Sequence, residues 1–279
     1  MLSASELKSV LREHGLRLTK RLGQNYLVDA RTVTRVVDAC QLMPAETVVE
    51  IGAGLGALTD ALAERAGRVF AVEVDRGIAE LLSQRMAPRA NVRVVHQDIL
   101  TCDWSAWEAA AVVGAIPYQI TSPILVELST HRARIRRAVL VVQYEVARRL
   151  LAAPGRAEYG RLSVLAQYGW EVAKLFDVSR RAFFPQPDVD STCVRLVPRP
   201  QPAVAVGDEA WFFNVVKAAF GQRRKTVANC LVGARPGLAR TEVEAALRQL
   251  GLSTAARGET LSLSQFAELS QLLARYATN

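Results

Sequence analysis

Short runs of β-branched and other apolar residues alternate with amphipathic stretches along the first 200 residues of the chain. Such runs are typical of strands buried on both faces, and apolar positions three or four residues apart are typical of helices that pack on one side. The alternation predicts a parallel sheet covered by helices. The expected strands are residues 47–51, 68–74, 92–97, 111–114 and 138–143, and the expected helices are 57–66, 76–86, 121–130 and 144–152.

The pattern changes near residue 197, where the segment VPRPQPAVAV contains three prolines. Proline lacks a backbone donor and interrupts helices and strand ladders, so this segment predicts a domain boundary. Beyond it, leucine and alanine recur at helical spacing, without strand-like runs, over residues 208–279. We therefore expect a doubly wound, mostly parallel α/β domain over residues 1–200 and a small C-terminal all-α domain over residues 207–279.

Composition narrows the class of protein further. Half of the residues are hydrophobic, and 35 Lys and Arg against 27 Asp and Glu give a net charge of +8. A basic balance favours polyanionic partners such as nucleic acids, although an arginine-rich proteome would give the same balance. Because no apolar run has the ~18 residues that span a bilayer, and none resembles a signal peptide, we expect a cytoplasmic protein without a membrane partner.

Cysteine and histidine give little sign of metal or redox chemistry. The four cysteines lie far apart and form no C-x-x-C pair, which predicts buried, reduced thiols. The three histidines have no spacing that would bring two of them to one helical face. We therefore expect neither a catalytic metal nor a histidine-activated nucleophile.

A glycine-rich segment, EIGAGLG, follows the first expected strand and contains Gly52, Gly54 and Gly56. Glycine permits the sharp turn and the close approach of backbone to ligand that nucleotide sites need at this point of the fold. Extended to Ala57, the segment also satisfies G-x-G-x-x-A, so a nicotinamide or flavin dinucleotide remains an alternative at this stage. A tight turn without any ligand is the third possibility.

Carboxylates end the second and third expected strands. Glu73 lies 21 residues after Gly52, a spacing from which a carboxylate accepts hydrogen bonds from ribose hydroxyls of either NAD or S-adenosylmethionine. Asp98 follows the third strand, and the carboxyl ends of parallel strands meet at one edge of a sheet, where this side chain can reach an adenine amino group. The sequence therefore predicts a nucleoside site at that edge.

The segment Gly114–Tyr118 (GAIPY) follows the fourth expected strand and resembles the (D/N)-P-P-(Y/F/W) motif of methyltransferases that act on exocyclic amino groups. It is similar in particular to the N-(L/I)-P-(Y/F) form of the KsgA-type rRNA adenine dimethyltransferases. Four more segments match that family in order: Arg21–Leu27 with G-Q-N-F-L, Phe183–Ser191 with F-x-P-x-P-x-V-D-S, Phe220–Thr226 with F-x-x-R-R-K-T, and Arg257–Ser262 with R-x-E-x-L-S. The resemblance covers essentially the whole chain and separates it from dinucleotide oxidoreductases.

The resemblance implies an activity and a partner. It implies a class I methyltransferase with a Rossmann-like fold, which uses S-adenosylmethionine to dimethylate N6 of two adjacent adenosines in a hairpin near the 3′ end of small-subunit rRNA. It also implies a role in assembly of the 30S particle and a monomeric state.

The resemblance also implies a set of site residues. Those expected at the cofactor are Gln24, Asn25, Leu27, Gly52, Gly54, Glu73, Asp98 and Ala115. Those expected at the target base are Ala115, Ile116, Pro117, Tyr118 and Phe183. The rings of Tyr118 and Phe183 would lie on opposite faces of the base.

One position departs from the family motif, because relatives carry asparagine where this chain has Ala115. The N6 lone pair of adenine is conjugated into the ring, and acceptors for the two N6 hydrogens favour its pyramidal, nucleophilic form. Relatives supply a side-chain amide oxygen and a main-chain carbonyl, here that of Ile116, and alanine removes the first. Loss of one such group typically costs ~10²–10³ in rate, so we predict a chain that binds S-adenosylmethionine and methylates poorly.

Several alternatives stay open. Ala115 marks either a natural or engineered inactive variant that still binds its ligands, or an active variant in which Gln119 or a water is the acceptor. A non-catalytic RNA-binding assembly factor on the same fold is the alternative function. An antibiotic-resistance methylase for large-subunit rRNA belongs to a neighbouring family, although the R-R-K-T and R-x-E-x-L-S segments favour the small-subunit group. A lesser departure, Asp188 where relatives often have lysine, removes positive charge from a loop expected near RNA.

Arginine is dense over residues 131–161, which contain eight arginines and two acids. Its planar guanidinium donates two parallel hydrogen bonds to phosphate, which positions RNA without reading its bases. We expect RNA contacts from this stretch and from the shorter R-R-K cluster of the second domain, with a solvated surface as the alternative. The residues are Arg132, Arg134, Arg136, Arg137, Arg223, Arg224 and Lys225.

Overall fold

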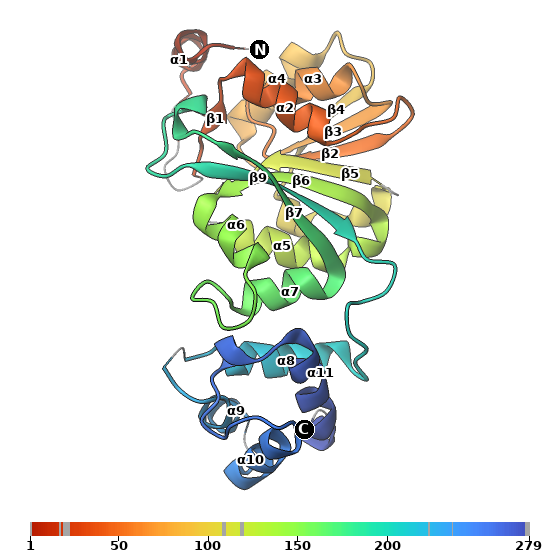
Figure 1. Ribbon diagram of the computed structural model, residues 1–279. Helices are drawn as coiled ribbons and strands as arrows, with labels where there is room; N and C mark the ends of the chain where they lie inside the picture. The colour runs from red at the N-terminus through yellow and green to blue at the C-terminus, as the bar shows by residue number, and fades with distance from the viewer. Residues whose placement is uncertain are drawn as a thin grey trace. The chain divides into compact units, whose positions relative to one another are not determined.

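The structure is a computed structural model that describes residues 2–16, 18, 23–107, 110–117, 120–222, 224–235 and 237–276. Contacts divide the chain into two compact units, residues 1–147 with 171–198 and residues 148–170 with 199–279 (Figure 1). The sequence predicted a single division at residues 200–207. In the structure, the segment 148–170 belongs to the second unit as well. That segment packs with the C-terminal helices, where for example the ring of Tyr168 stacks on Phe212 with centroids 5.2 Å apart.

A seven-stranded sheet forms the centre of the first unit. Its order is β4-β3-β2-β5-β6-β9-β7; the pairs from β4 to β6 are parallel, and β9 is antiparallel to β6. The strands are β2 (Thr47–Ile51), β3 (Arg68–Glu73), β4 (Val92–His96), β5 (Ala110–Ala115), β6 (Ile135–Gln143), β7 (Trp170–Val178) and β9 (Ser191–Pro198). The mostly parallel sheet expected from the sequence is therefore confirmed.

Helices cover both faces of this sheet (Figure 1). Apolar side chains of α2, α3 and α4 pack on one face, where they form the cores around Val48, Val113 and Ala71. On the other face, α5 packs beside the short helical turn that follows β4. The helices of this unit are α1 (Ala4–Glu13), α2 (Ala30–Ala39), α3 (Ala57–Ala63), α4 (Arg76–Met86), α5 (Thr121–Thr130) and the start of α6 (Tyr144–Leu151).

The strand order reverses between β2 and β5. From β2 the chain adds β3 and β4 on one side and then returns to place β5 on the other, which creates a crevice at the carboxyl ends of β2 and β5. In this pair Glu50 lies opposite Val113 and Ile51 opposite Gly114. Gly114 permits the close approach, since a Cβ there would lie 2.7 Å from the Ile51 carbonyl oxygen. The next residues along, Gly52 and Ala115, flank the crevice.

A second, two-stranded sheet joins distant parts of the chain. Strand β1 (Tyr26–Leu27) pairs antiparallel with β8 (Phe183–Phe184), so that Leu27 lies opposite Phe183. The Val28 N–H also donates to the Ala182 carbonyl at 2.8 Å. This pairing brings the G-Q-N-Y-L segment beside the F-F-P-Q-P segment, two motifs far apart in the sequence.

The second unit is helical, as expected for the C-terminal part of the chain. Its helices are α7 (Arg161–Gly169), α8 (Glu209–Ala219), α9 (Val227–Ala234), α10 (Arg240–Gln249) and α11 (Leu263–Leu272). Phe212, Val216 and Phe266 lie in its fully buried core. Two family-motif residues are helix caps here: the Thr226 side chain accepts from the Asn229 N–H, and that of Ser262 from the Gln265 N–H. These positions therefore have a structural role.

All four cysteines are buried, free thiols, and burial raises the pKa of Cys40 and Cys193 to about 12. In the part of the chain that the structure describes, no helix combines the length and apolar character needed to cross a membrane.

Candidate active site

A cavity of about 150 Å³ lies at the carboxyl edge of the parallel sheet, where the strand order reverses. Residues from the ends of β2, β3, β4 and β5 line it, together with the segment before β1 and the start of β8. The sequence-predicted residues that line it are Gln24, Asn25, Gly52, Glu73, Asp98, Ala115, Ile116, Pro117 and Phe183. Leu27 and Gly54 do not line it, and Tyr118 and Gln119 lie outside the described residues.

The glycine turn gives the cavity its floor. Gly52 and Gly54 have φ angles of +70° and +56°, a backbone region that residues with a Cβ rarely adopt. A Cβ on Gly54 would lie 2.6 Å from ring atoms of Tyr26, so a larger residue would displace that ring. At Gly52 the added Cβ would meet only the Pro117 Cδ, at 3.9 Å, which leaves room above the turn for a ligand.

Glu73 connects the glycine turn to the second strand. Its carboxylate accepts hydrogen bonds from the Gly54 N–H at 2.8 Å and the Asp75 N–H at 2.9 Å, and the residue is 6% exposed. Burial raises the pKa of this carboxyl above its ordinary value, although the two backbone donors oppose the shift. The arrangement fixes the carboxylate at the cavity wall, where its remaining lone pairs can accept from a ligand.

The other polar lining residues are held by local hydrogen bonds. Asp98 accepts from the Leu100 N–H at 3.0 Å and so caps the short helical turn after β4. Asn25 Nδ2 donates to the Gly23 carbonyl at 3.1 Å, and Gln24 Nε2 donates to Asp75 at 3.2 Å. Gln24 and Asn25 are consecutive in the sequence and Asp98 is distant from them, and the fold brings all three side chains to one cavity.

The described residues expected at the target base line the same cavity. Ala115 ends β5 opposite Val141 of β6, and the Ile116 N–H donates to the Val141 carbonyl at 3.0 Å. Phe183, 6% exposed, lines the same cavity from β8. The turn and the ring are therefore placed around one space, although their contact with a base stays a prediction.

Several lining residues were not predicted from the sequence. Tyr26 belongs to the quoted G-Q-N-F-L segment but has a hydroxyl where the motif has phenylalanine, and this buried hydroxyl has no hydrogen-bond partner. Burial, followed by the charge of Glu73, raises its pKa. Ser191 ends the quoted V-D-S segment, so both residues could have been found from the motifs. The apolar lining residues Ile51, Ile99, Ile120 and Val141 carry no such signal.

The lining fits a nucleoside better than a metal ion. Carboxylates of Glu73 and Asp98 suit hydroxyl and amino donors, the apolar side chains suit a flat base, and the orphan Tyr26 hydroxyl would gain a partner from a bound polar group. Within the described residues, no group of three or more His, Cys, Asp or Glu side chains could hold a metal ion.

Comparison with known sequences decides the family. The family model of ribosomal RNA adenine dimethylases matches residues 15–275. The chain belongs to this family. It is similar to the ribosomal RNA small subunit methyltransferase A of Moorella thermoacetica, 45% identical with 95% of this chain and 96% of that protein covered. It is also similar to the protein of that name from Geobacillus kaustophilus, 43% identical with 96% and 94% covered.

Solved structures agree with the fold. A dimethyladenosine transferase from Plasmodium falciparum superposes with a TM-score of 0.76 at 23% identity, covering 90% of this chain and 98% of that one. The 23S rRNA methyltransferase ErmE gives a TM-score of 0.68 at 33% identity, covering 90% and 100%. The expected methyltransferase fold and the family of rRNA adenine dimethyltransferases are thus confirmed, and the dinucleotide oxidoreductase is set aside.

The first arginine cluster lies far from this cavity. Arg132 and Arg134 precede β6, so they lie at its amino end, whereas Val141 near its carboxyl end lines the cavity. At the usual rise per strand residue, that separation is ~20 Å. RNA held by these arginines would therefore reach the cavity only by extending along the unit.

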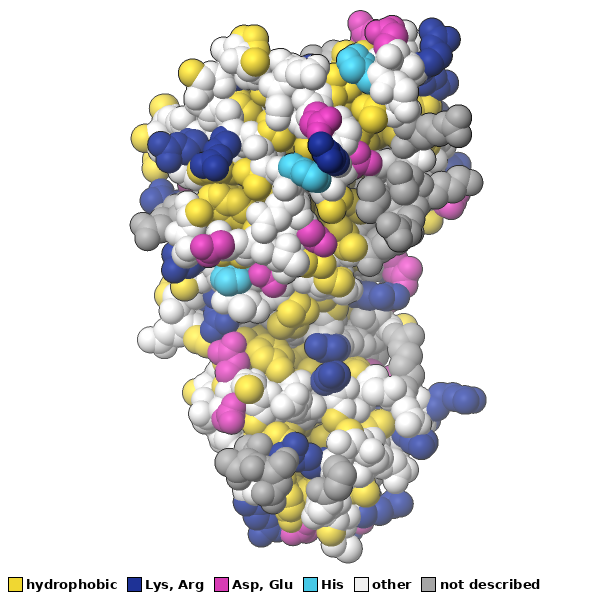
Figure 2. Space-filling model, turned by 180° about the vertical axis from the view of Figure 1, so that it is seen from behind, with side chains coloured by type: hydrophobic (Ala, Val, Ile, Leu, Met, Phe, Trp, Pro, Cys, Tyr) yellow, Lys and Arg dark blue, Asp and Glu magenta, His cyan; other side chains and the backbone are white. Residues whose placement is uncertain are grey.

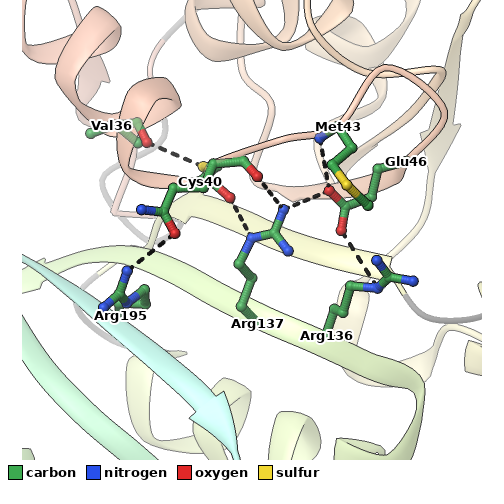
Figure 3. A network of polar contacts seen from close by, with 8 residues as sticks. Val36, Cys40, Met43, Glu46, Arg136, Arg137 and Arg195 are labelled. Atoms are coloured by element: carbon green, nitrogen blue, oxygen red, sulfur yellow. Dashed lines mark hydrogen bonds and ion pairs between the residues drawn. The ribbon is translucent and has the colours of Figure 1, made fainter.

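Arg137 is committed to contacts inside the protein (Figure 3). Its side chain is 14% exposed, pairs with Glu46 at 2.5 Å, and donates to the carbonyls of Cys40 and Gln41. Arg136 differs, because its side chain is 50% exposed and lies 3.8 Å from Glu46. The prediction that Arg137 contacts RNA is therefore withdrawn: its planar head joins β6 to the segment after α2.

The second basic cluster lies in the helical unit. Arg224 and Lys225 are exposed in the loop between α8 and α9, and Arg223 lies outside the described residues. On the side shown in Figure 2, the described Lys and Arg side chains occur in small groups among acidic and apolar side chains. A polyanion bound on that side would contact several separate small groups of basic side chains.

Glu50 is a buried carboxyl beside the glycine turn, and it was not predicted as a site residue. It is 1% exposed, and its Oε2 accepts from Thr59 Oγ1 at 2.6 Å. Burial raises the pKa of this carboxyl to about 8, against the lowering effect of the Thr59 hydrogen bond. Its place in the quoted EIGAGLG segment was the available signal.

The first prediction concerns stability and the proton on Glu50. Between its ordinary pKa of 4.5 and about 8, the unfolded chain carries Glu50 ionised while the folded chain keeps the proton. The free energy of unfolding should therefore fall as pH rises through this window, by up to about 1.4 kcal/mol per pH unit from this group. Urea unfolding of the parent and Glu50→Gln at pH 5, 6, 7 and 8 should show the variant gaining relative stability with pH. A constant difference would contradict the buried, protonated carboxyl.

The second prediction concerns Arg137. Arg137→Gln leaves the Glu46 carboxylate, whose side chain is 3% exposed, without its close cation. Breaking a buried pair in this way costs about 3–5 kcal/mol of unfolding free energy, whereas Arg136→Gln, the matched control, should cost under about 1 kcal/mol. Urea denaturation of both variants measures the difference. Equal stability of the two variants, with RNA affinity lost only in Arg137→Gln, would restore the RNA role.

Proposed function

We propose that this chain binds S-adenosylmethionine in the cavity at the carboxyl ends of β2 and β5 and transfers methyl groups to N6 of adenosines in small-subunit rRNA. The observation that carries the proposal is the convergence of the glycine turn, two carboxylates and the Ala115–Pro117 turn on one cavity. In a chain of the rRNA adenine dimethylase family, such a cavity is the place for both reactants.

The cofactor residues divide by the part of the ligand they would hold. Glu73 accepts from the ribose hydroxyls and Asp98 from the adenine amino group, while Gln24 and Asn25 hold the methionine end. Gly52 leaves room for the ligand. Leu27 and Gly54 act indirectly, since Gly54 fixes Glu73 and Leu27 pairs with Phe183 across the small sheet.

The target base would lie between the aromatic side chains of Tyr118 and Phe183, against the Ile116–Pro117 turn. S-Adenosylmethionine supplies a methyl group on a sulfonium: the N6 lone pair forms the new C–N bond, the S–C pair stays on sulfur, and one N6 proton leaves to water. The Ile116 carbonyl accepts from one N6 hydrogen and favours the nucleophilic form of the nitrogen. Ala115 offers no side-chain acceptor for the other, so turnover is slow.

The substrate proposal rests on the named relatives. The two proteins named small-subunit methyltransferases above share 43% and 45% identity with this chain, against 33% for ErmE, whose name refers to 23S rRNA. We therefore favour the small-subunit substrate, with two adjacent adenosines of the 3′-terminal hairpin as targets. Binding to the assembling 30S particle, action as a monomer and a cytoplasmic location belong to the same proposal.

The proposed RNA contacts come from both units. Arg132, Arg134 and Arg136 before and within β6 offer phosphate contacts, as do Arg224 and Lys225 in the helical unit together with Arg223. Such contacts supply affinity and orientation, whereas selection of the adenosines depends on hairpin shape and on bases that leave the stack.

A second function is favoured by one specific observation. Because Ala115 removes an acceptor aimed at the transition state, the chain could retain both ligands without useful turnover and serve as an RNA-binding assembly factor. The two functions differ in turnover and agree in binding.

The third prediction distinguishes these functions. Labelled methyl groups from S-adenosylmethionine are offered to unmethylated 30S particles with the parent chain or Ala115→Asn, and binding of both proteins to the particles is measured in parallel. We expect Ala115→Asn to restore an acceptor and transfer methyl groups faster, by up to ~10²–10³-fold. If neither protein transfers methyl groups while both bind, the assembly factor replaces the enzyme. Equal rates would show that the side chain at position 115 has no part in the reaction.

A further inference from the structure

A small chamber adjoins the proposed active site. Its volume is about 40 Å³, and it shares the lining residues Asn25, Tyr26, Gly52 and Ala115 with the larger cavity. The rest of its lining is apolar except for the carboxyl of Glu50. The chamber is therefore a side pocket next to position 115, and three of its lining side chains carry polar groups: Asn25, Tyr26 and Glu50.

The strand register explains why Glu50 borders this chamber. Side chains alternate between the faces of a strand, and Glu50 lies opposite Val113 in the parallel pair β2–β5. Ala115, two residues after Val113, is thus on the same face of the sheet as Glu50. A longer side chain at position 115 would extend into the space that Ala115 leaves open.

The chamber has the size and polarity to hold water. One buried water needs ~10–15 Å³ and two to four polar partners. One oxygen of the Glu50 carboxyl accepts a hydrogen bond from Thr59. Asn25 Nδ2 donates to the Gly23 carbonyl, which leaves the Asn25 side-chain oxygen as an acceptor. Because burial keeps the proton on Glu50 below about pH 8, the carboxyl donates to such a water. The water in turn donates to the Asn25 side-chain oxygen and keeps a lone pair for a third partner.

We propose that a water molecule, held by Glu50 and Asn25 in the chamber next to Ala115, takes the place of the missing side-chain amide and accepts from the second N6 hydrogen of the target adenosine. Glu50 is then a positioning residue, which acts through the water and does not touch the substrate. The inference rests on the proposed function and explains how turnover persists in a chain with alanine at this position.

Leucine at position 50 is the informative substitution, and glutamine is its conservative counterpart. In Glu50→Gln, Thr59 Oγ1 can still donate to the side-chain oxygen, and the amide nitrogen donates to the water as the protonated carboxyl does. In Glu50→Leu neither group is present, so the water loses its partner at position 50.

The test is a double-mutant cycle with the full chain, in which Glu50→Leu, and beside it Glu50→Gln, is made in the parent and in Ala115→Asn. Methyl transfer to unmethylated 30S particles is measured, together with KM for S-adenosylmethionine and binding to the particles. In the parent, Glu50→Leu should lower kcat about tenfold with KM unchanged, the value of one hydrogen bond, and Glu50→Gln should recover most of that loss. In Ala115→Asn, where the amide fills the chamber, Glu50→Leu should cost no more than about twofold.

Each other outcome has a distinct meaning. Equal losses in both backgrounds, or none in either, would make Glu50 structural or irrelevant and overturn the inference. Absence of turnover in the parent beside an active Ala115→Asn would also overturn it, and would favour the second function, in which this chain binds both ligands without turnover. If neither protein turns over although both bind particles, the proposed function fails and the inference fails with it.

A crystal structure gives a readout independent of activity. At high resolution the parent chain should show an ordered water within hydrogen-bond distance of Glu50 and Asn25, and Ala115→Asn should displace it. An empty chamber in the parent would overturn the proposal whatever the kinetic result.

Discussion

The parallel pairing of β2 with β5 is the constraint on which the rest of this site depends. It places Glu50 opposite Val113 and Ile51 opposite Gly114, so the glycine turn and the Ala115–Pro117 turn leave the sheet side by side. Because the chain reverses its direction of growth at this pair, no crossover helix covers the gap. The cavity and the side chamber follow from that register, and the neighbouring β2–β3 pair adds Glu73 beside Gly54.

The parts of the fold and site that the sequence predicted are those set by local pattern. The five parallel strands and the helices between them follow from periodicity, and Gly52, Glu73 and Asp98 converge because parallel strands end at one edge. Long-range pairings carry no comparable signal. The antiparallel β9, the β1–β8 pair and the packing of residues 148–170 with the C-terminal helices were therefore not predicted.

Charge was the least reliable guide, because a sequence count of arginines does not reveal their partners. Arg137 lies in the densest basic stretch but pairs with a buried glutamate from another element, while its neighbour Arg136 stays half exposed (Figure 3). The motif residues Thr226 and Ser262 likewise cap helices. Ala115 is the reverse case. The sequence shows that the side-chain acceptor is missing at this position, but only the structure shows the chamber and the Glu50 carboxyl beside it.

Equilibrium binding of S-adenosylmethionine, measured by titration calorimetry, tests the central claim about the cavity most directly. The proteins are the parent, Glu73→Gln, and the control Glu80→Gln, whose side chain is exposed on α4. The account predicts one bound cofactor per parent chain, unchanged affinity in the control, and a loss of about 1.5–3 kcal/mol in Glu73→Gln, the value of a hydrogen bond to a charged group. Absence of binding by the parent, or equal affinity of all three proteins, would contradict it.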